Sequence, residues 1–96
     1  MSEFESVLLQ KKIIGNVGYA RFKISGKDRL SMHGSCVVYK VEVGEMTVVV
    51  REHANVLKQG DRITIEANTP YFKEGDATVF ARDVPPFNPD TLIFLD

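Results

Sequence analysis

The stretch that decides the predicted fold runs from Val48 to Val84 and reads VVVREHANVLKQGDRITIEANTPYFKEGDATVFARDV. It opens with three valines, and β-branched side chains favour strands. Polar and apolar residues alternate in Arg62–Ala67, and Ala77–Val84 has the same character, as expected for strands with one buried face. Between these segments, apolar residues three positions apart in Glu52–Gln59 predict a short amphipathic helix that ends at a glycine.

Three further strands are predicted, Val7–Ile14, Tyr19–Ser25 and Cys36–Val43, and they precede Met46–Arg51, the strand that contains the three valines. Gly44-Glu45 is predicted to be a tight hairpin turn between the last two. A small all-β domain with one helix between its third and fourth strands is the arrangement of the OB-fold. The predicted fold is therefore an OB-fold-like barrel of five to six strands. Its predicted core comprises Phe22, Ile24, Val48, Val50, Leu57, Ile63 and Ile65.

The length and composition of the chain fit one domain. It has 96 residues, 44% of them hydrophobic, which is enough for a single core. We predict that residues 1–87 form this domain, because prolines at positions 85, 86 and 89 then interrupt any strand. Residues 88–96 form an apolar and acidic tail, which either folds back as an edge strand or projects. We predict that the tail binds another protein or a second copy of the chain through Leu92, Ile93, Phe94 and Leu95.

The N-terminal residues and the cysteine content predict a cytoplasmic location. Residues 1–5, MSEFE, are acidic and lack the basic start and apolar stretch of a signal peptide. Cys36 is the single cysteine and has no partner for an internal disulfide, which fits a reducing compartment. No apolar run approaches the roughly 18 residues that cross a bilayer, so we predict no membrane association.

Charge is distributed unevenly along a chain whose net charge is −1. The first 40 residues carry seven basic and three acidic side chains, whereas residues 41–96 carry five basic and ten acidic ones. This asymmetry allows one cationic face on a protein without overall positive charge. The alternative is an ordinary solvated surface of uneven charge.

Two segments predict contacts with single-stranded nucleic acid. In Tyr19–Ile24 successive side chains point to opposite faces, which places Tyr19, Arg21 and Lys23 on the face away from the core. We expect the tyrosine ring to stack on bases and the two cations to contact phosphates. The predicted loop Asn68–Asp76 holds two adjacent aromatic residues and a lysine. With the other basic side chains of this face, the predicted nucleic-acid-binding residues are Tyr19, Arg21, Lys23, Lys27, Arg29, Lys40, Arg51, Tyr71, Phe72, Lys73 and Arg82.

No pattern in the sequence indicates catalysis, a metal site or a cofactor. His33 and Cys36 are three positions apart, but a zinc site needs four ligands, and the only further histidine or cysteine is His53. Neither Cys36 nor a serine has a recognisable histidine base and orienting acid. No glycine-rich phosphate loop is present in the sequence. We therefore predict a protein that is not an enzyme and holds no cofactor or metal.

The order of elements from Tyr19 to Phe87 resembles single-stranded DNA-binding proteins of the bacterial and phage type. The matching pieces are Val48–Val50 with Asn55–Gly60, then Asp61–Ala67, then Ala77–Val84. The resemblance implies an OB-fold that binds single-stranded DNA, in preference to RNA, without catalysis. The chain departs from that family because it has no Trp, no long glycine-rich linker and no terminal acidic Pro-Phe tip.

The alternative function is that of an OB-fold adaptor or accessory subunit in a replication or transcription complex. Such a protein acts through protein–protein contacts. The net acidity, the missing Trp and the apolar tail favour this alternative.

Overall fold

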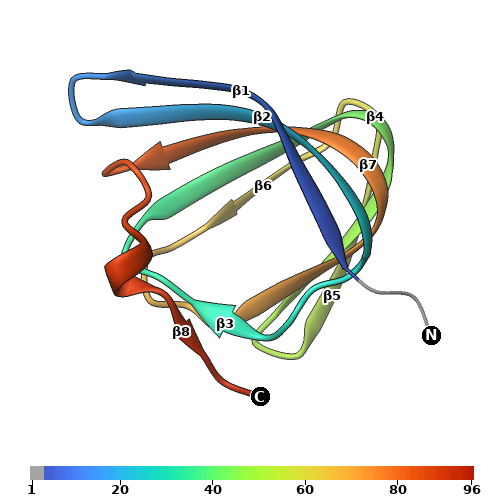
Figure 1. The fold of residues 1–96 in the computed structure, drawn as a ribbon. Coiled ribbons are helices and arrows are strands. Elements are labelled where there is room, and N and C mark those ends of the chain that lie inside the picture. Colours follow the sequence, from blue (N-terminus) through green and yellow to red (C-terminus); the bar gives the residue numbers. More distant parts are fainter. Residues whose placement is uncertain (1–3) are drawn as a thin grey trace.

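The computed structural model describes residues 4–96 and is built almost entirely of β-strands (Figure 1). The all-β class predicted from the sequence is therefore confirmed. Within the described residues, no helix has the length and apolar character needed to cross a lipid bilayer. The strands are β1 (Glu5–Ile14), β2 (Val17–Lys27), β3 (Ser31–Met32), β4 (Cys36–Val50), β5 (His53–Lys58), β6 (Arg62–Ile65), β7 (Tyr71–Val84) and β8 (Ile93–Phe94), and one short 3-10 helix, η1 (Pro89–Thr91), precedes β8.

The two longest strands, β4 and β7, pair antiparallel along their whole lengths and form the frame of the barrel. On its other edge β7 pairs with β2, and β2 pairs with β1. β4 also pairs with β5 and β6, so one continuous sheet curls around the core (Figure 1). The result is a small barrel whose inner face is set by the alternation of side chains along each strand.

Gly44 lies inside β4 and marks a bulge, so the hairpin turn predicted for Gly44-Glu45 is wrong. The register of β4 against β7 shifts between Val41 and Val43, and Gly44 has a φ of 87°. A Cβ atom at this position would collide with the main-chain oxygen of Asp76. Glycine alone tolerates both this φ and so close an approach, and the strand bends here before it continues.

The predicted helix between the third and fourth strands is also wrong, because residues 53–58 form β5, which pairs with β4. Arg51 and Glu52 form the connecting turn and have φ values of 47° and 70°. Positive φ at both positions is the geometry of a tight turn between antiparallel strands. Leu57 is buried while Val56 is 55% exposed. Ala54 is exposed, so the apolar residues three positions apart that suggested a helix, Ala54 and Leu57, lie on opposite faces of a strand.

The core lies between the inner faces of the curled sheet. Of the predicted core residues, four are buried, namely Ile24, Val48, Leu57 and Ile65; the other three, Phe22, Val50 and Ile63, are partly buried and pack against them. Most of the remaining core comes from β4 and β7, whose full lengths the sequence did not reveal. The buried apolar residues outside the predicted set are Val37, Tyr39, Val41, Met46, Tyr71, Ala77, Val79 and Ala81.

The tail folds back on the barrel as an edge strand, one of the two alternatives that the sequence left open. β8 pairs with β3, and the Leu95 N–H donates to the Leu30 carbonyl at 2.9 Å. The Asp96 carboxylate accepts a hydrogen bond from Arg29 Nε at 3.1 Å and another from the Leu30 N–H. The division of the chain at residue 87 stays a prediction. The apolar side chains of the tail remain partly open to solvent: Leu92, Ile93, Phe94 and Leu95.

Ile65 and Ile13 provide a matched test of the core. Ile65 is 1% exposed on β6, whereas Ile13 is 55% exposed on β1. Ile65→Ala should lower the free energy of unfolding by about 2–5 kcal/mol, because it removes buried methyl groups and leaves a cavity. Ile13→Ala should change it by less than about 0.5 kcal/mol. Urea denaturation measures both values, and equal losses would contradict the inward placement of Ile65.

Candidate functional site

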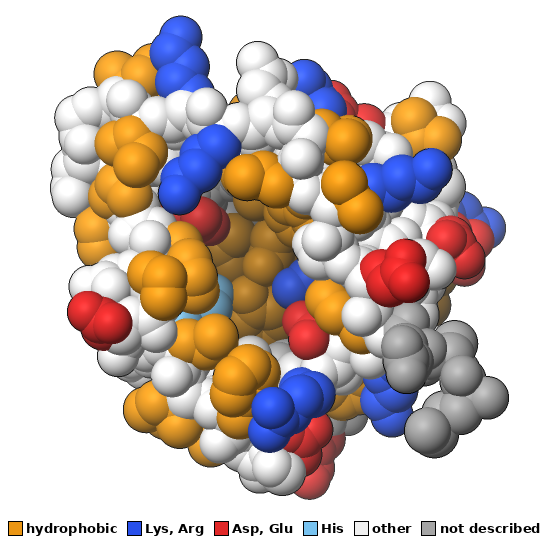
Figure 2. Space-filling view, in the orientation of Figure 1, with side chains coloured by type: hydrophobic (Ala, Val, Ile, Leu, Met, Phe, Trp, Pro, Cys, Tyr) orange, Lys and Arg blue, Asp and Glu red, His pale blue; other side chains and the backbone are white. Residues whose placement is uncertain are grey.

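One end of the barrel opens into a cavity of about 460 Å³. Figure 2 shows a deep hollow with a hydrophobic floor and charged side chains of both signs around the opening. Strands β1, β2, β3, β4 and β7 contribute its walls, and the segment after β7 borders its mouth. Its polar lining residues are Ser6, Lys11, Asp28, Ser31, His33, Tyr39, Tyr71, Lys73 and Asp83, and its apolar ones are Phe4, Leu8, Ala20, Phe22, Ala81, Phe87, Leu92 and Phe94.

β7 supplies groups to this cavity from both of its ends, because the strand is strongly curled (Figure 1). Tyr71 and Lys73 lie at its start, and Ala81 and Asp83 lie at its end. All four occupy alternate positions that face the interior, and the positions between them face outward. One strand therefore places a phenol and a cation on one side of the cavity and a carboxyl group on another.

His33, Tyr71 and Tyr39 form a buried chain of hydrogen bonds in the cavity wall. His33 Nε2 lies 2.8 Å from Tyr71 Oη, and Tyr71 Oη lies 2.7 Å from Tyr39 Oη. The Ser35 N–H donates to His33 Nδ1 at 3.2 Å. Because Nδ1 accepts, the neutral imidazole carries its proton on Nε2 and donates it to Tyr71. The Phe87 ring packs edge-on against His33, with centroids 5.2 Å apart, and helps to hold the imidazole in place.

Burial keeps all three members of this chain uncharged. Burial lowers the pKa of His33, and the nearby charge of Lys73 acts in the same direction. Burial also raises the pKa of Tyr39 and that of Tyr71 well above the ordinary phenol value. At neutral pH the three groups are therefore an imidazole and two hydroxyl groups, and one phenol hydrogen is left to donate to a ligand oxygen.

Lys73 places a cation in the same cavity, with only 12% of its side chain exposed. Its Nζ donates to Asp28 Oδ2 at 3.2 Å, and the Asp28 N–H donates to the main-chain oxygen of Lys73 at 2.8 Å. The π faces of aromatic rings attract a cation at such positions, so the charge is held at the cavity wall. The ring centroids 5.4–6.0 Å from Nζ are those of Phe4, Phe22, Tyr39 and Tyr71.

Asp83 faces the cavity from the far end of β7. Burial raises the pKa of its carboxyl group to about 6, and the charges of Lys73 and Lys11 limit the rise. Within residues 4–96 its side chain makes neither a salt bridge nor a hydrogen bond. A carboxyl group with a pKa near neutrality and free lone pairs is suited to accept and return a proton.

The donor set of the cavity does not fit a metal centre. In the described part of the chain, no three His, Cys, Asp or Glu side chains are grouped closely enough to hold a metal ion. Both ring nitrogens of His33 are already engaged, by Tyr71 and by the Ser35 N–H.

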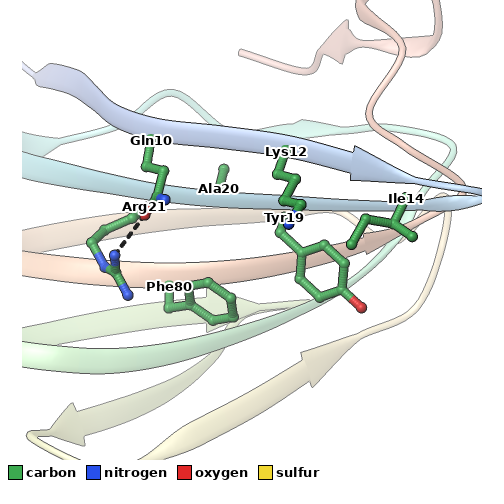
Figure 3. A pocket seen from close by; sticks show the side chains of 7 residues that line it. All are labelled: Gln10, Lys12, Ile14, Tyr19, Ala20, Arg21 and Phe80. Atoms are coloured by element: carbon green, nitrogen blue, oxygen red, sulfur yellow. Dashed lines mark hydrogen bonds between the residues drawn. The ribbon is translucent and has the colours of Figure 1, made fainter.

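The outer face of β2 holds Tyr19 and Arg21, two of the residues predicted to bind nucleic acid (Figure 3). They border a second hollow of about 240 Å³. Arg21 donates from Nε to Glu42 at 2.6 Å and from Nη1 to Gln10 at 2.7 Å, and its guanidinium lies over the Phe80 ring. Tyr19 stacks on the same ring, with centroids 6.1 Å apart. The guanidinium of Arg21 is thus bound by partners within the chain.

The other residues of that prediction are divided among several surfaces. Tyr71 and Lys73 lie in the cavity, because β7 begins at Tyr71 and includes residues 71–76 of the predicted loop Asn68–Asp76. Arg51 lies in the turn between β4 and β5, and Lys27 and Arg29 lie at the end of β2 and just beyond it. The remaining members occupy β2, β4 or β7 and do not line the cavity: Lys23, Lys40, Phe72 and Arg82.

Sequence reasoning missed Tyr39, Asp28 and Asp83 and considered His33 only as a zinc ligand. A signal was present for two of them. Tyr39 and Asp83 occupy inward positions of β4 and β7 in otherwise apolar alternating segments. A polar side chain on a buried face is more informative than an apolar one, and it marks a candidate site.

Comparison with known proteins gives no match to a family model or to a curated protein, but solved structures share the fold. Pac13, described as a nucleoside dehydratase, has a TM-score of 0.79 at 18% identity, over 95% of this chain and 85% of that one. Streptomyces Pac13 in a variant form with uridine has a TM-score of 0.70 at 15% identity, over 91% and 84%. A cupin-2 domain-containing protein from Shewanella frigidimarina has a TM-score of 0.70 at 12% identity, over 79% and 80%.

These likenesses define a cupin-like barrel and correct several predictions. The OB-fold and the resemblance to single-stranded DNA-binding proteins are wrong, because the matching folds are barrels of the Pac13 and cupin-2 type. For the same reason, single-stranded nucleic-acid binding and the alternative of a replication or transcription subunit are wrong. The predicted partners, namely nucleic acid and a protein or second copy at the tail, are corrected likewise. A dehydratase among these structures also opposes the prediction of a protein that is not an enzyme.

Asp83→Asn tests the environment of the carboxyl group. The pKa of Asp83 rises from an ordinary 3.8 to about 6 on folding, so the folded state loses stability as pH rises from about 4 to about 6. The amide cannot ionise and avoids this loss. We expect Asp83→Asn to be more stable than wild type by about 1–2 kcal/mol above about pH 7, and the gain to vanish near about pH 4.

Thermal denaturation at both pH values measures this difference. Asp76→Asn is the matched control, because Asp76 lies on the same strand and its side chain is exposed. A gain that is the same at both pH values, or an equal gain in the control, would contradict the buried setting of Asp83.

Proposed function

We propose that this protein binds a small, polar organic molecule in the barrel cavity and catalyses proton transfer on it. The reaction class that fits the site best is the removal of water from a hydroxylated carbonyl compound. The observation that carries the proposal is the buried chain of His33, Tyr71 and Tyr39, which borders a cavity that also holds Lys73 and Asp83.

The cavity has the size and lining of a small-molecule site. Its volume of about 460 Å³ lies within the range of about 300–1,000 Å³ that is usual for ligand pockets. The lining combines apolar and aromatic side chains with polar groups that converge on the cavity. Such sites gain affinity from the apolar contacts and fix the orientation of the ligand through the polar groups.

Lys73 and the two phenols are suited to hold a carbonyl oxygen. Removal of a proton from the carbon beside a carbonyl puts negative charge on that oxygen, and preorganised donors stabilise such charge best where water is excluded. Lys73 supplies a cation held by Asp28. The raised pKa of Tyr71 and Tyr39 keeps both phenols protonated, and the chain leaves one of their two hydrogens free to donate to that oxygen.

Asp83 is suited to carry the proton through the reaction. Its carboxylate takes the proton from the carbon beside the carbonyl, and the electron pair of that C–H bond moves onto the carbonyl oxygen. The pair then returns to form a C=C bond as the C–O bond of the hydroxyl on the next carbon breaks. Asp83 gives the same proton to the departing hydroxide, so water leaves and the carboxylate is restored.

The fold neighbours support the choice of ligand. Pac13 is described as a nucleoside dehydratase, and one of its variants was solved with uridine. We therefore propose a molecule of nucleoside size, with uridine as the first probe. This proposal of enzymatic activity replaces the expectation from the sequence that the protein is not an enzyme. A cytoplasmic location stays a prediction.

Tyr71→Phe tests the proposal, with Tyr19→Phe on the outer face as the matched control. The first variant removes the hydroxyl that links His33 to Tyr39, whereas the second removes a hydroxyl outside the cavity. In isothermal titration with uridine, Tyr71→Phe should weaken binding by about tenfold, the effect of one hydrogen bond of about 1.4 kcal/mol. Tyr19→Phe should bind as wild type does.

Hydrogen exchange on a carbonyl compound tests catalysis separately. Glyceraldehyde, a small hydroxy aldehyde, is incubated with the protein in D₂O, and proton NMR follows the loss of the hydrogen beside the carbonyl. Wild type should accelerate this exchange, and Tyr71→Phe should slow it. Absence of both uridine binding and exchange in wild type would contradict the proposal, and uridine binding without exchange would contradict its catalytic part.

A further inference from the structure

Two lysines and two carboxyl groups line the cavity, so its positive and negative side chains are equal in number. Lys73 is matched by Asp28, its partner at 3.2 Å. Lys11 on β1 and Asp83 on β7 also line the cavity, and the charge of Lys11 acts on the pKa of Asp83. Arg29 is outside this lining; it is bound by Asp96 at 3.1 Å and lies over the ring of Phe94, which is a lining residue. The described lining therefore has no surplus of positive charge.

We infer that the cavity selects an uncharged ligand that presents a hydroxyl or N–H donor to Asp83, and that it excludes the phosphorylated form of the same molecule. This inference rests on the proposed function and names the substrate class of that site. It follows from three features of the lining: the balanced charges, the unpaired carboxylate and the engaged cation.

A phosphate group is disfavoured because Lys11 and Lys73 are offset by the two carboxyl groups of the same lining, so no net positive charge is available to neutralise it. A phosphate monoester brings about −1.5 to −2 charges at neutral pH. Recognition of such a group usually relies on an arginine fork, a helix N-terminus or a glycine-rich loop. Lys73 already donates to Asp28 among four rings, and the unpaired Asp83 would repel the anion.

A donor on the ligand is favoured because Asp83 has acceptor capacity that the described chain does not use. An ionised carboxylate is a pure acceptor with room for several hydrogen bonds. A partly buried polar group without a hydrogen-bond partner carries a desolvation cost, and a donor on the ligand removes that cost. The hydroxyl groups of a sugar or the N–H of a base supply such a donor without adding charge.

This arrangement also makes the affinity for a neutral ligand depend on pH. The groups that act on Asp83 are Lys73 at the start of β7 and Lys11 on β1, and the phenols of Tyr39 and Tyr71 respond to its charge. Below a pH of about 6 the carboxyl group is protonated and loses acceptor capacity. The affinity for uridine should therefore fall as pH is lowered from about 7.5 to about 5.

Isothermal titration of the full chain with three probes tests the inference. The probes are uridine, uridine 5′-monophosphate and 5′-O-acetyluridine, whose uncharged ester controls for bulk at the same position. At neutral pH, uridine and its acetate should each bind about tenfold or more tightly than the monophosphate. Asp83→Asn should reduce the ratio of the uridine affinity to the monophosphate affinity, because the amide does not repel the phosphate. Asp76→Asn, exposed on the same strand, should leave the ratio unchanged.

Each outcome separates the inference from the proposed function. The inference would be overturned, and the proposed function left standing, if the protein binds uridine but binds the monophosphate equally or more tightly. The same holds if Asp83→Asn leaves the ratio of the uridine affinity to the monophosphate affinity unchanged. If the acetate and the monophosphate both bind equally weakly compared with uridine, the cavity excludes them by size, and this result would also overturn the inference. Failure of all three probes to bind wild type would overturn both.

Discussion

The antiparallel pairing of β4 with β7 is the constraint on which the rest of this structure depends. It runs the full length of both strands and therefore decides which side chains of each face the interior. A slip of one residue along β7 would turn Tyr71, Lys73 and Asp83 outward and bring Phe72 inward, because successive side chains of a strand point to opposite faces. The cavity is thus largely a product of sheet register: Tyr39, Tyr71, Lys73 and Asp83 lie on strands, whereas Asp28 and His33 lie in the connections on either side of β3.

Period-two alternation was a sound guide to most strands and a poor guide to their connections. The predicted strands Tyr19–Ser25, Arg62–Ala67 and Ala77–Val84 coincide with or overlap β2, β6 and β7. The turn between β4 and β5 escaped prediction because a turn with two positive φ values usually carries Asn or Gly, whereas here Arg51 and Glu52 adopt it. With that turn hidden, the strand after it was interpreted as a helix, and the helix led to the OB-fold.

The candidate site was beyond the reach of sequence patterns because its partners meet across long separations. Tyr71 is bonded to residues 38 and 32 positions away, His33 and Tyr39. Alternation indicates that such side chains face inward, but the curl of β7 determines which inward side chains meet. Tyr71 and Lys73 were assigned to a solvated loop, and the strand that begins at Tyr71 turns both into the barrel.

The hydrogen-bond chain in the cavity wall has one polar hydrogen more than it can use. His33 Nε2 carries one hydrogen and each phenol carries another, but only two bonds link the three groups. His33 Nδ1 is occupied by the Ser35 N–H and cannot accept the third hydrogen. One phenol hydrogen therefore stays unused, and rotation of the hydroxyl groups moves it between Tyr71 and Tyr39 without breaking the chain. The wall can thus offer a donor from either of two positions, and that donor can follow a ligand oxygen that shifts during a reaction.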